Sequence, residues 1–246
     1  MTERRDPDMR QPTALVTGAT SGIGRAVAVK LAADGVYVYV HGRDASRGAA
    51  TLEAIERAGG KGQFVAADLS DLDDVARLAA AVGEVDVLVN NGGLSWFGPT
   101  PDLAAKTFDT MFASNVRAAY YLVAALAPAM VKRGSGSIIS LSSMAGQVGL
   151  AGGAAYSATK AALAAMTRAW AAEFSPSGVR VNAIAPGPVF TDGSNPQLIE
   201  QLGSTTLLGR AAHVDGIADV IAFLASPKAS YITSTVVAAD GGRTAI

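Results

Sequence analysis

The chain has 246 residues, a formal net charge of −1, no cysteine and only 17% charged residues. This length can form one large α/β domain or two small ones, and either buries a full core without cross-links. The missing cysteines exclude a disulfide framework, a thiolate zinc site and a cysteine nucleophile, and they are typical of a reducing compartment. The near-zero charge argues against a nucleic-acid partner, because nucleic-acid-binding proteins usually carry a clear basic excess.

The first residues, 1–11, are charged and contain no apolar run. We therefore expect a disordered polar tail there, and neither a signal peptide nor a membrane anchor. The longest stretch without a charge, 134–159, contains six glycines and six serines. That composition makes a poor membrane-spanning helix and is typical of an active-site wall. We expect a cytoplasmic protein with no membrane partner.

Short, mostly β-branched runs alternate with longer segments of helical period along the rest of the chain. The expected strands span 13–17, 36–41, 63–67, 85–90, 137–141, 180–184 and 235–239. The expected helices span 22–34, 45–58, 72–82, 102–133, 155–174 and 214–225. Repeated strand–helix–strand units require right-handed crossovers, which build an open parallel sheet with helices on both faces. The pattern predicts an α/β fold, a single Rossmann-type, doubly wound domain of about seven strands over residues 12–246.

A glycine-rich turn follows the first expected strand and leads into an alanine-rich helix. Glycines there permit a sharp turn and a close approach of the backbone to a pyrophosphate, while the helix N-terminus supplies N–H groups and a favourable dipole. The spacing is G-x-x-x-G-x-G, which differs from the G-x-G-x-x-G fingerprint, so a tight connection without a ligand is the alternative. The place of the turn at the first strand favours dinucleotide binding. The candidate contacts are Gly18, Thr20, Ser21, Gly22, Ile23 and Gly24.

The end of the second expected strand determines which dinucleotide fits. An acidic residue there would bind the ribose hydroxyls of NAD, but Gly42 and Arg43 occupy this place. Gly42 leaves room for a 2′-phosphate and the Arg43 guanidinium can bind it in a bidentate manner, so the pattern favours NADP(H) over NAD(H). The alternative is a solvated Arg43 beside Asp44. Asp68, after the third strand, is suited either to accept from the adenine amino group or to cap the next helix.

Tyr156 and Lys160 are four residues apart within an expected helix, so they lie on one face of it. A nearby ammonium favours the phenolate and lowers the tyrosine pKa, which makes the pair a usable acid/base at neutral pH. The alternative is a surface tyrosine over a lysine. Ser143, after the fifth strand, is placed to hydrogen-bond a substrate carbonyl, or else it is part of an ordinary turn.

Taken together, the motifs resemble those of the single-domain short-chain dehydrogenase/reductase family. The resemblance covers residues 13–243 and rests on six motifs in order: the glycine-rich turn, Asn90-Asn91-Gly92-Gly93, Asn115, Ser143, Tyr156-x-x-x-Lys160 and Pro186-Gly187. It departs from the family at Gly92, where alanine is usual. The resemblance implies a Rossmann-type fold, NADP(H)-dependent interconversion of a carbonyl and an alcohol, no metal, and assembly into a homotetramer.

The resemblance also implies a role for each matching residue. Tyr156 is the expected general acid/base, Lys160 binds the nicotinamide ribose, Ser143 polarises the carbonyl, and Asn115 holds a water of a proton relay. Tyr156 and Lys160 count as cofactor contacts as well. The other expected cofactor residues are Asp68, Leu69, Asn90, Gly92, Pro186, Gly187, Val189 and Thr191. The segment 192–208 resembles a mobile lid over the substrate.

The substrate stays open between three alternatives. Reduction of a 3-oxoacyl group on acyl carrier protein would need basic residues at the site. Lys132 and Arg133 lie at one candidate place, but the turn 175–178 carries no basic residue. A small-molecule carbonyl or alcohol suits the mixed apolar lining expected from Ser95, Trp96, Phe97, Gln147, Val148, Leu150 and Phe190. A dinucleotide-binding sensor or scaffold without turnover is the third alternative, and it would not need the four catalytic residues together.

Overall fold

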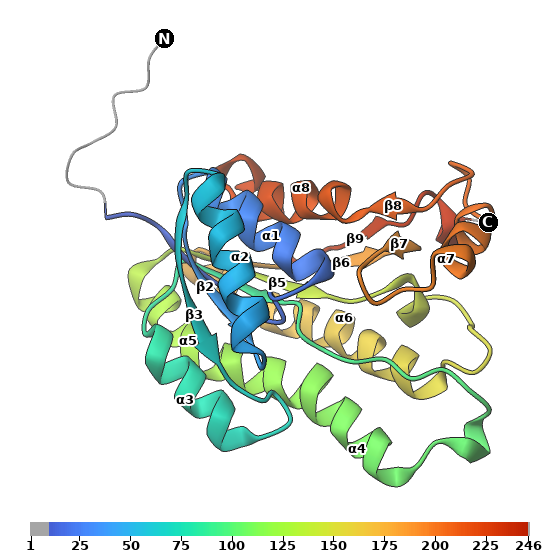
Figure 1. Ribbon diagram of the computed structural model, residues 1–246. Coiled ribbons are helices and arrows are strands. Elements are labelled where there is room, and N and C mark those ends of the chain that lie inside the picture. Colours follow the sequence, from blue (N-terminus) through green and yellow to red (C-terminus); the bar gives the residue numbers. More distant parts are fainter. Residues whose placement is uncertain (1–9, 246) are drawn as a thin grey trace.

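A parallel sheet of seven strands runs through the computed structural model, which describes residues 10–245 (Figure 1). The strand order is β3-β2-β1-β4-β5-β6-β9, so the expected doubly wound sheet is confirmed. The chain first builds outward from β1 and then returns to the other side at β4, which places a crevice between the carboxyl ends of these two strands. The strands are β1 (Thr13–Val16), β2 (Tyr37–Gly42), β3 (Lys61–Ala66), β4 (Val87–Asn90), β5 (Gly136–Leu141), β6 (Val179–Pro186) and β9 (Val236–Ala239).

Two layers of helices cover the sheet (Figure 1). One face packs against α1 (Gly22–Ala33), α2 (Ala45–Arg57) and α8 (Val214–Ala225), and the other against α3 (Leu72–Val82), α5 (Ala118–Arg133) and α6 (Ala154–Phe174). Alternation along β1 produces this division, because Ala14 and Val16 point into the first core and Leu15 into the second. All three side chains are fully buried.

The expected helix over 102–133 is interrupted near its start. A single 3₁₀ turn, η1 (Thr100–Asp102), precedes α4 (Ala105–Phe112), and a π-helical segment, η2 (Ala113–Arg117), joins α4 to α5. A π-turn is closed by i→i+5 hydrogen bonds, so it accommodates an extra residue without breaking the helix. The apolar pattern of the sequence continues across η2 and does not reveal this change.

The segment after β6 is more regular than the lid expected over 192–208. It contains α7 (Pro196–Gly203), whose N-terminus is capped by Asn195 through bonds from the N–H groups of Gln197 and Leu198. A short sheet of β7 (Val189–Phe190) and β8 (Ala212–His213) ties both ends of the segment together. These elements are two to eight residues long, which is too short for a periodic signal.

Asp86 lies just before β4, at the edge of the sheet where the strands begin, and joins several segments there. Its carboxylate accepts from the backbone N–H of Thr13 at 2.8 Å and lies 2.8 Å from Arg10 and 3.3 Å from Arg133. Most of the tail expected over 1–11 falls outside the described residues. Of its last two residues, Arg10 pairs with Asp86, and Gln11 donates to the carbonyl of Gly35 at 3.1 Å. Among the described helices, none is both long enough and apolar enough to cross a membrane.

We expect Asp86→Ala to lower the free energy of unfolding by about 1–3 kcal/mol, because a backbone N–H and two guanidinium groups lose their acceptor. Urea unfolding at matched protein concentration measures this loss. Glu84→Ala is the control, since that carboxylate is 70% exposed and only approaches Arg133 at 3.6 Å; a loss below ~0.5 kcal/mol is expected for it. Equal losses in the two variants would contradict the role of Asp86.

Candidate active site

A cleft of about 1150 Å³ opens at the carboxyl edge of the sheet, over the crevice between β1 and β4. It collects most of the predicted site residues from segments far apart in the sequence. They are Gly18, Thr20, Ser21, Gly22, Ile23, Gly24, Arg43, Asp68, Leu69, Gly92, Ser143, Tyr156, Lys160, Pro186, Gly187, Val189 and Thr191. Asn90 and Asn115 lie behind the cleft wall and do not line it.

The glycine-rich turn lies directly against the loop after β4. Gly18 has a φ of +62°, and a Cβ on it would lie 2.7 Å from the Cα of Gly92. No side chain fits between the two segments, so glycine is required at 18. The turn then enters α1 with the N–H groups of its first residues facing the cleft, which is the arrangement that binds a phosphate.

Two residues that were not predicted as site residues hold this turn in place. The Asn91 amide donates to the carbonyl of Thr17 at 2.7 Å and to that of Gly18 at 3.1 Å. The Thr17 hydroxyl in turn accepts from the N–H groups of Asn91 and Gly92 at 3.0 and 2.8 Å. The paired asparagines of the sequence motif are the only sequence signal for these bonds, and only the fold shows which one reaches the turn.

Asn90, expected among the cofactor residues, is buried at the end of β4 and is 5% exposed. Its side-chain amide has no hydrogen-bond partner within the described part of the chain, and neither has the hydroxyl of Ser140, its register partner on β5. The structure therefore places Asn90 inside the sheet beside the cleft, and its role among the cofactor residues stays a prediction.

The end of β2 forms the basic end of the cleft. Gly42 packs against Thr20, and a Cβ at 42 would overlap the Thr20 methyl carbon and lie 2.9 Å from its hydroxyl oxygen, so a side chain at 42 would require Thr20 to move. Arg43 lines the cleft and makes no ion pair with any carboxylate in residues 10–245. Arg47, on the first turn of α2, also lines the cleft, and its Nε lies 3.9 Å from Asp44.

Asp68 caps its own turn. One carboxylate oxygen accepts from the backbone N–H and the hydroxyl of Ser70, both at 2.9 Å, and the first of these bonds is the main cause that lowers the pKa of Asp68. The backbone N–H of Asp68 donates to Asp74 at 2.7 Å. The N-cap of the next helix, α3, is Asp71, whose side chain accepts from the N–H groups of Asp73 and Asp74, so Asp68 does not cap that helix. The side chain of Asp68 borders the cleft together with Leu69, and its contact with an adenine amino group stays a prediction.

The helix α6 supplies the two expected acid/base residues. The Lys160 ammonium donates to the carbonyl of Leu141 at 2.7 Å, and the Ser142 hydroxyl donates to the carbonyl of Lys160 at 2.8 Å. These bonds fasten α6 to the end of β5. Burial lowers the pKa of Lys160 to about 8, because the charged ammonium is poorly solvated there.

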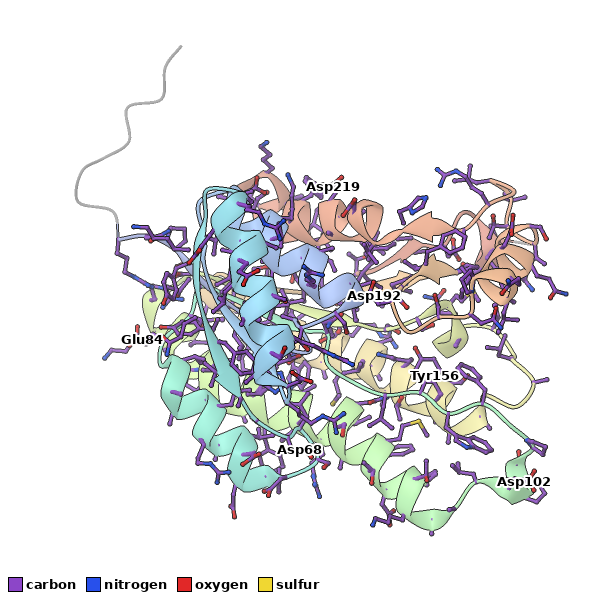
Figure 2. The ribbon with its side chains drawn as sticks, viewed as in Figure 1. Asp68, Glu84, Asp102, Tyr156, Asp192 and Asp219 are labelled. Carbon is purple, nitrogen blue, oxygen red and sulfur yellow. The ribbon has the colours of Figure 1, made fainter. Side chains whose placement is uncertain are left out.

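Tyr156 points from α6 into the cleft (Figure 2) and packs against Phe97, with ring centroids 5.3 Å apart. Burial raises the pKa of its hydroxyl, and a hydrogen bond with Ser143 offsets part of that rise. The lowering by Lys160 that the sequence predicts is not found here. The reason is geometric, because the ammonium is bonded to Leu141 and lies 5.7 Å from the centroid of the Tyr156 ring.

Asn115 lies in the π-helical segment η2 and is 2% exposed. Its amide oxygen accepts from the N–H of Leu94 at 2.8 Å, and its amide nitrogen donates to the Leu94 carbonyl at 2.8 Å and to the Thr159 hydroxyl at 3.1 Å. The side chain thus fixes the cleft wall at Leu94 and joins it to α6. The water-holding role of Asn115 stays a prediction.

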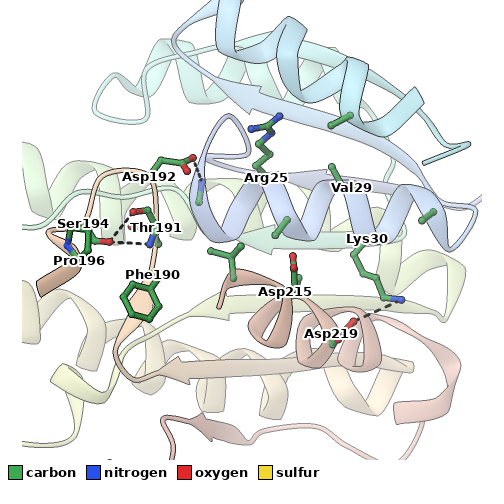
Figure 3. Close-up of a pocket in the computed structure, with 16 residues that line it drawn as sticks. Arg25, Val29, Lys30, Phe190, Thr191, Asp192, Ser194, Pro196, Asp215 and Asp219 are labelled. Atoms are coloured by element: carbon green, nitrogen blue, oxygen red, sulfur yellow. Dashed lines mark hydrogen bonds and ion pairs between the residues drawn. The ribbon is translucent and has the colours of Figure 1, made fainter. Parts of the chain in front are cut away.

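The segment after β6 closes the cleft over the glycine-rich turn. The backbone N–H of Thr191 donates to the Ser194 hydroxyl at 3.0 Å, and that hydroxyl donates back to the Thr191 carbonyl at 2.8 Å (Figure 3). Asp192 accepts from the N–H of Gly22 at 3.5 Å. A second cavity of about 640 Å³ lies beyond this segment, between α1 and α8, and none of the four expected catalytic residues lines it.

The remaining wall of the cleft, next to Tyr156, is apolar. The expected substrate residues Ser95, Phe97 and Leu150 line it, whereas Trp96, Gln147, Val148 and Phe190 do not. Leucine and isoleucine side chains of α7 complete this wall, and the sequence did not predict them. The apolar side chains are Phe97, Met144, Leu150, Ala151, Pro188, Leu198, Ile199 and Leu202. Within residues 10–245, no group of three or more histidine, aspartate and glutamate side chains is placed to hold a metal ion.

Comparison with known proteins agrees with this geometry. The short chain dehydrogenase family model matches residues 12–201. The chain is 36% identical to the 3-oxoacyl-[acyl-carrier-protein] reductase FabG of Staphylococcus aureus (strain Mu50 / ATCC 700699), covering 94% of this chain and 97% of that one.

Two solved structures match nearly the whole chain. A short chain dehydrogenase/reductase family protein has a TM-score of 0.88 at 47% identity, with 96% of this chain and 98% of that chain covered. The angucycline C-6 ketoreductase LanV with bound NADP has a TM-score of 0.88 at 33% identity, with 96% of each chain covered. The chain belongs to the short-chain dehydrogenase family of oxidoreductases, which bind a nicotinamide dinucleotide.

Proposed function

We propose that the protein is an NADP(H)-dependent oxidoreductase that interconverts a carbonyl and an alcohol. The observation that carries the proposal is a single cleft in which Ser143, Tyr156 and Lys160 face the phosphate-binding turn of α1. The donor set fits a dinucleotide, because the N–H groups at the start of α1 and the α1 dipole suit a pyrophosphate. A dinucleotide-binding sensor would not need the hydroxyl and ammonium groups at the other end.

The chemistry follows from what these side chains can donate. The bound nicotinamide supplies or accepts the hydride. Ser143 donates a hydrogen bond to the carbonyl oxygen and polarises it, and the Tyr156 hydroxyl gives its proton to the same oxygen as the alcohol forms. Burial keeps Tyr156 protonated, which suits the role of proton donor. Lys160, bonded to the Leu141 carbonyl, fixes the base of this arrangement and places a positive charge below the phenol ring.

The preference for NADP(H) rests on the end of β2. Arg43 and Arg47 supply two guanidinium groups at the rim of the cleft, and Gly42 supplies no carboxylate to repel a phosphate. The similar ketoreductase LanV is a structure with bound NADP. Bidentate hydrogen bonds from a guanidinium suit a phosphate and have no counterpart on a ribose hydroxyl.

The apolar wall supports a neutral, apolar carbonyl substrate. The side chains around Tyr156 include aromatic, aliphatic and methionine groups. Apart from Lys160, whose ammonium lies 5.7 Å from the centroid of the Tyr156 ring, the charged groups that line the cleft are Arg43, Asp44, Arg47, Asp68 and Asp192. The similarity to FabG makes a 3-oxoacyl group on acyl carrier protein the second candidate. Arg133 gives that candidate no support within one chain, because it bonds to the Val85 carbonyl and pairs with Asp86 at the opposite edge of the sheet.

We further propose that the chain assembles into a homotetramer in the cytoplasm. Exposed aromatic side chains support self-association, because Phe108 on α4 and Tyr120 and Tyr121 on α5 are 41–50% exposed, and Tyr231 is fully exposed. Large exposed apolar patches commonly mark protein interfaces.

Tyr156→Phe is expected to lower kcat for ketone reduction by 10²-fold or more, on the order of the usual contribution of a general acid. The ring and its packing remain, so NADPH affinity is expected to stay within about twofold. Stopped-flow and steady-state kinetics with a panel of neutral ketones measure the rate, and fluorescence titration measures the affinity. Tyr37→Phe, in the first residue of β2, is the matched control, and activity near wild type in both variants would refute the assignment.

Arg43→Ala is expected to weaken NADPH binding by about 10-fold to 100-fold, the usual range for a lost charge-assisted hydrogen bond. NADH carries no 2′-phosphate, so its affinity is expected to change little. Titrations of both cofactors against wild type, Arg43→Ala and the control Arg57→Ala provide the comparison. Equal losses for the two cofactors would show that Arg43 does not bind the 2′-phosphate.

The pKa of Lys160 predicts a pH dependence for carbonyl reduction. Because burial lowers this pKa to about 8, the ammonium is lost as the pH rises through 8. We expect kcat/KM, which reports ionisations of the free enzyme, to be constant below that value and to fall above it. A pH–rate profile at constant ionic strength tests this. A profile that stays flat to pH 9.5 or above would contradict it.

A further inference from the structure

His41, next to the end of β2, connects two sides of the cofactor cleft. Its side chain is 3% exposed, and its two ring nitrogens bond to different segments. Nδ1 accepts from the backbone N–H of Gly18 at 3.0 Å, and Nε2 lies 3.1 Å from the carbonyl oxygen of Ala67. One imidazole therefore joins the glycine-rich turn to the end of β3, beside Asp68.

The backbone of the same residue completes a clamp on the turn. The N–H of Ala19 donates to the carbonyl of His41 at 2.8 Å, so residue 41 holds two successive N–H groups of the turn. From the other side, Asn91 holds the carbonyls of Thr17 and Gly18. The turn is thus fixed between β2 and β4, and these bonds supply the rigidity that its glycines lack.

The two partners of the imidazole determine its protonation state. The N–H of Gly18 can only donate, so Nδ1 must carry the lone pair, and the carbonyl of Ala67 can only accept, so Nε2 must carry the hydrogen. Only the neutral Nε2–H tautomer satisfies both bonds. Burial lowers the pKa of His41 below its ordinary value, which agrees with a neutral ring.

The charged groups around His41 are few. Arg43 follows β2 and opposes a second positive charge, whereas Asp68 follows β3 and favours one. The glycine-rich turn contributes no titratable side chain between residues 17 and 24. Protonation would turn Nδ1 into a donor that faces another donor, the N–H of Gly18.

We propose that His41 is a positioning residue for dinucleotide binding: as the neutral tautomer it fixes the turn relative to the end of β3, and its protonation weakens cofactor affinity. The proposal rests on the proposed function, in which this cleft binds NADP(H). His41 acts through Gly18 and Ala67 and leaves the proton transfer at Tyr156 unchanged.

Three substitutions separate the two bonds. His41→Asn places an amide oxygen where Nδ1 accepts, His41→Gln places an amide nitrogen where Nε2 donates, and His41→Leu removes both. We expect His41→Leu to weaken NADPH and NADH by a similar factor, about tenfold, while kcat at saturating cofactor changes less than twofold. His41→Asn is expected to recover most of the affinity at pH 8. His213→Asn, on exposed β8, is the control.

The pH dependence of NADH binding gives a second readout, because NADH has no 2′-phosphate that titrates. Wild-type affinity is expected to fall below pH 6.5, and that of His41→Asn to stay constant. Nitrogen-15 NMR of the imidazoles tests the tautomer of His41 without cofactor. The chain contains two histidines, so the exposed His213 gives the other imidazole signal and serves as the reference.

The outcomes distinguish the proposals. If the wild type binds neither NADPH nor NADH, the proposed function fails and this inference fails with it. If the wild type binds both, an Nδ1–H tautomer, or equal affinities in folded His41→Asn and His41→Leu with unchanged pH dependence, would overturn the role of His41 alone. Circular dichroism confirms folding, and if His41→Leu does not fold, the comparison of His41→Asn with His41→Gln decides the question.

Discussion

The direct contact between the backbone after β1 and the backbone after β4 is the constraint on which the site depends. Gly18 and Gly92 meet with no room for a side chain between them. Because β1 and β4 are neighbours in the sheet but are reached by crossovers on opposite faces, the crevice lies where two loops diverge. Holding these loops together at their base, through Asn91, leaves the N-terminus of α1 facing an open cleft. The proposed cofactor end and the proposed catalytic end of the cleft are both arranged around this contact.

The cleft separates charge from apolar surface along its length. Guanidinium groups and turn N–H groups occupy one end, where an anionic dinucleotide would bind, and the apolar wall near Tyr156 occupies the other. Burial acts on the two proposed catalytic groups in opposite directions, since it raises the pKa of Tyr156 and lowers that of Lys160. Both shifts favour the uncharged forms, which is what a poorly solvated environment does to any ionisable group. Tyr156 therefore keeps its proton more firmly than an exposed tyrosine, whereas Lys160 loses its proton more readily than an exposed lysine.

The sequence predicts those parts of the site that depend on local spacing. The four-residue interval from Tyr156 to Lys160 and the glycines of the turn are properties of one helix and one loop, and the structure places them in one cleft. Hydrogen bonds between segments that are far apart in the sequence cannot be predicted from local spacing. Asn91 and His41 reach the turn only because β4 and β2 flank β1, and Asn115 reaches Leu94 only through the π-helical segment. Trp96 and Gln147 were predicted for the substrate wall but do not line the cleft, because a sequence does not determine which way a loop side chain points.

The π-helical segment η2 also constrains the length of the chain. An α-helix advances by about 100° per residue, so removing one residue from Ala113–Arg117 would rotate α4 relative to α5 by roughly that angle. Such a deletion would turn the buried Met111 toward solvent or carry Asn115 away from Leu94. Substitutions keep the number of residues and leave the rotation of α4 relative to α5 unchanged, whereas an insertion or a deletion changes it. The number of residues in η2 thus sets the rotation of α4 relative to α5. We therefore expect the protein to tolerate substitutions in this region far better than insertions or deletions.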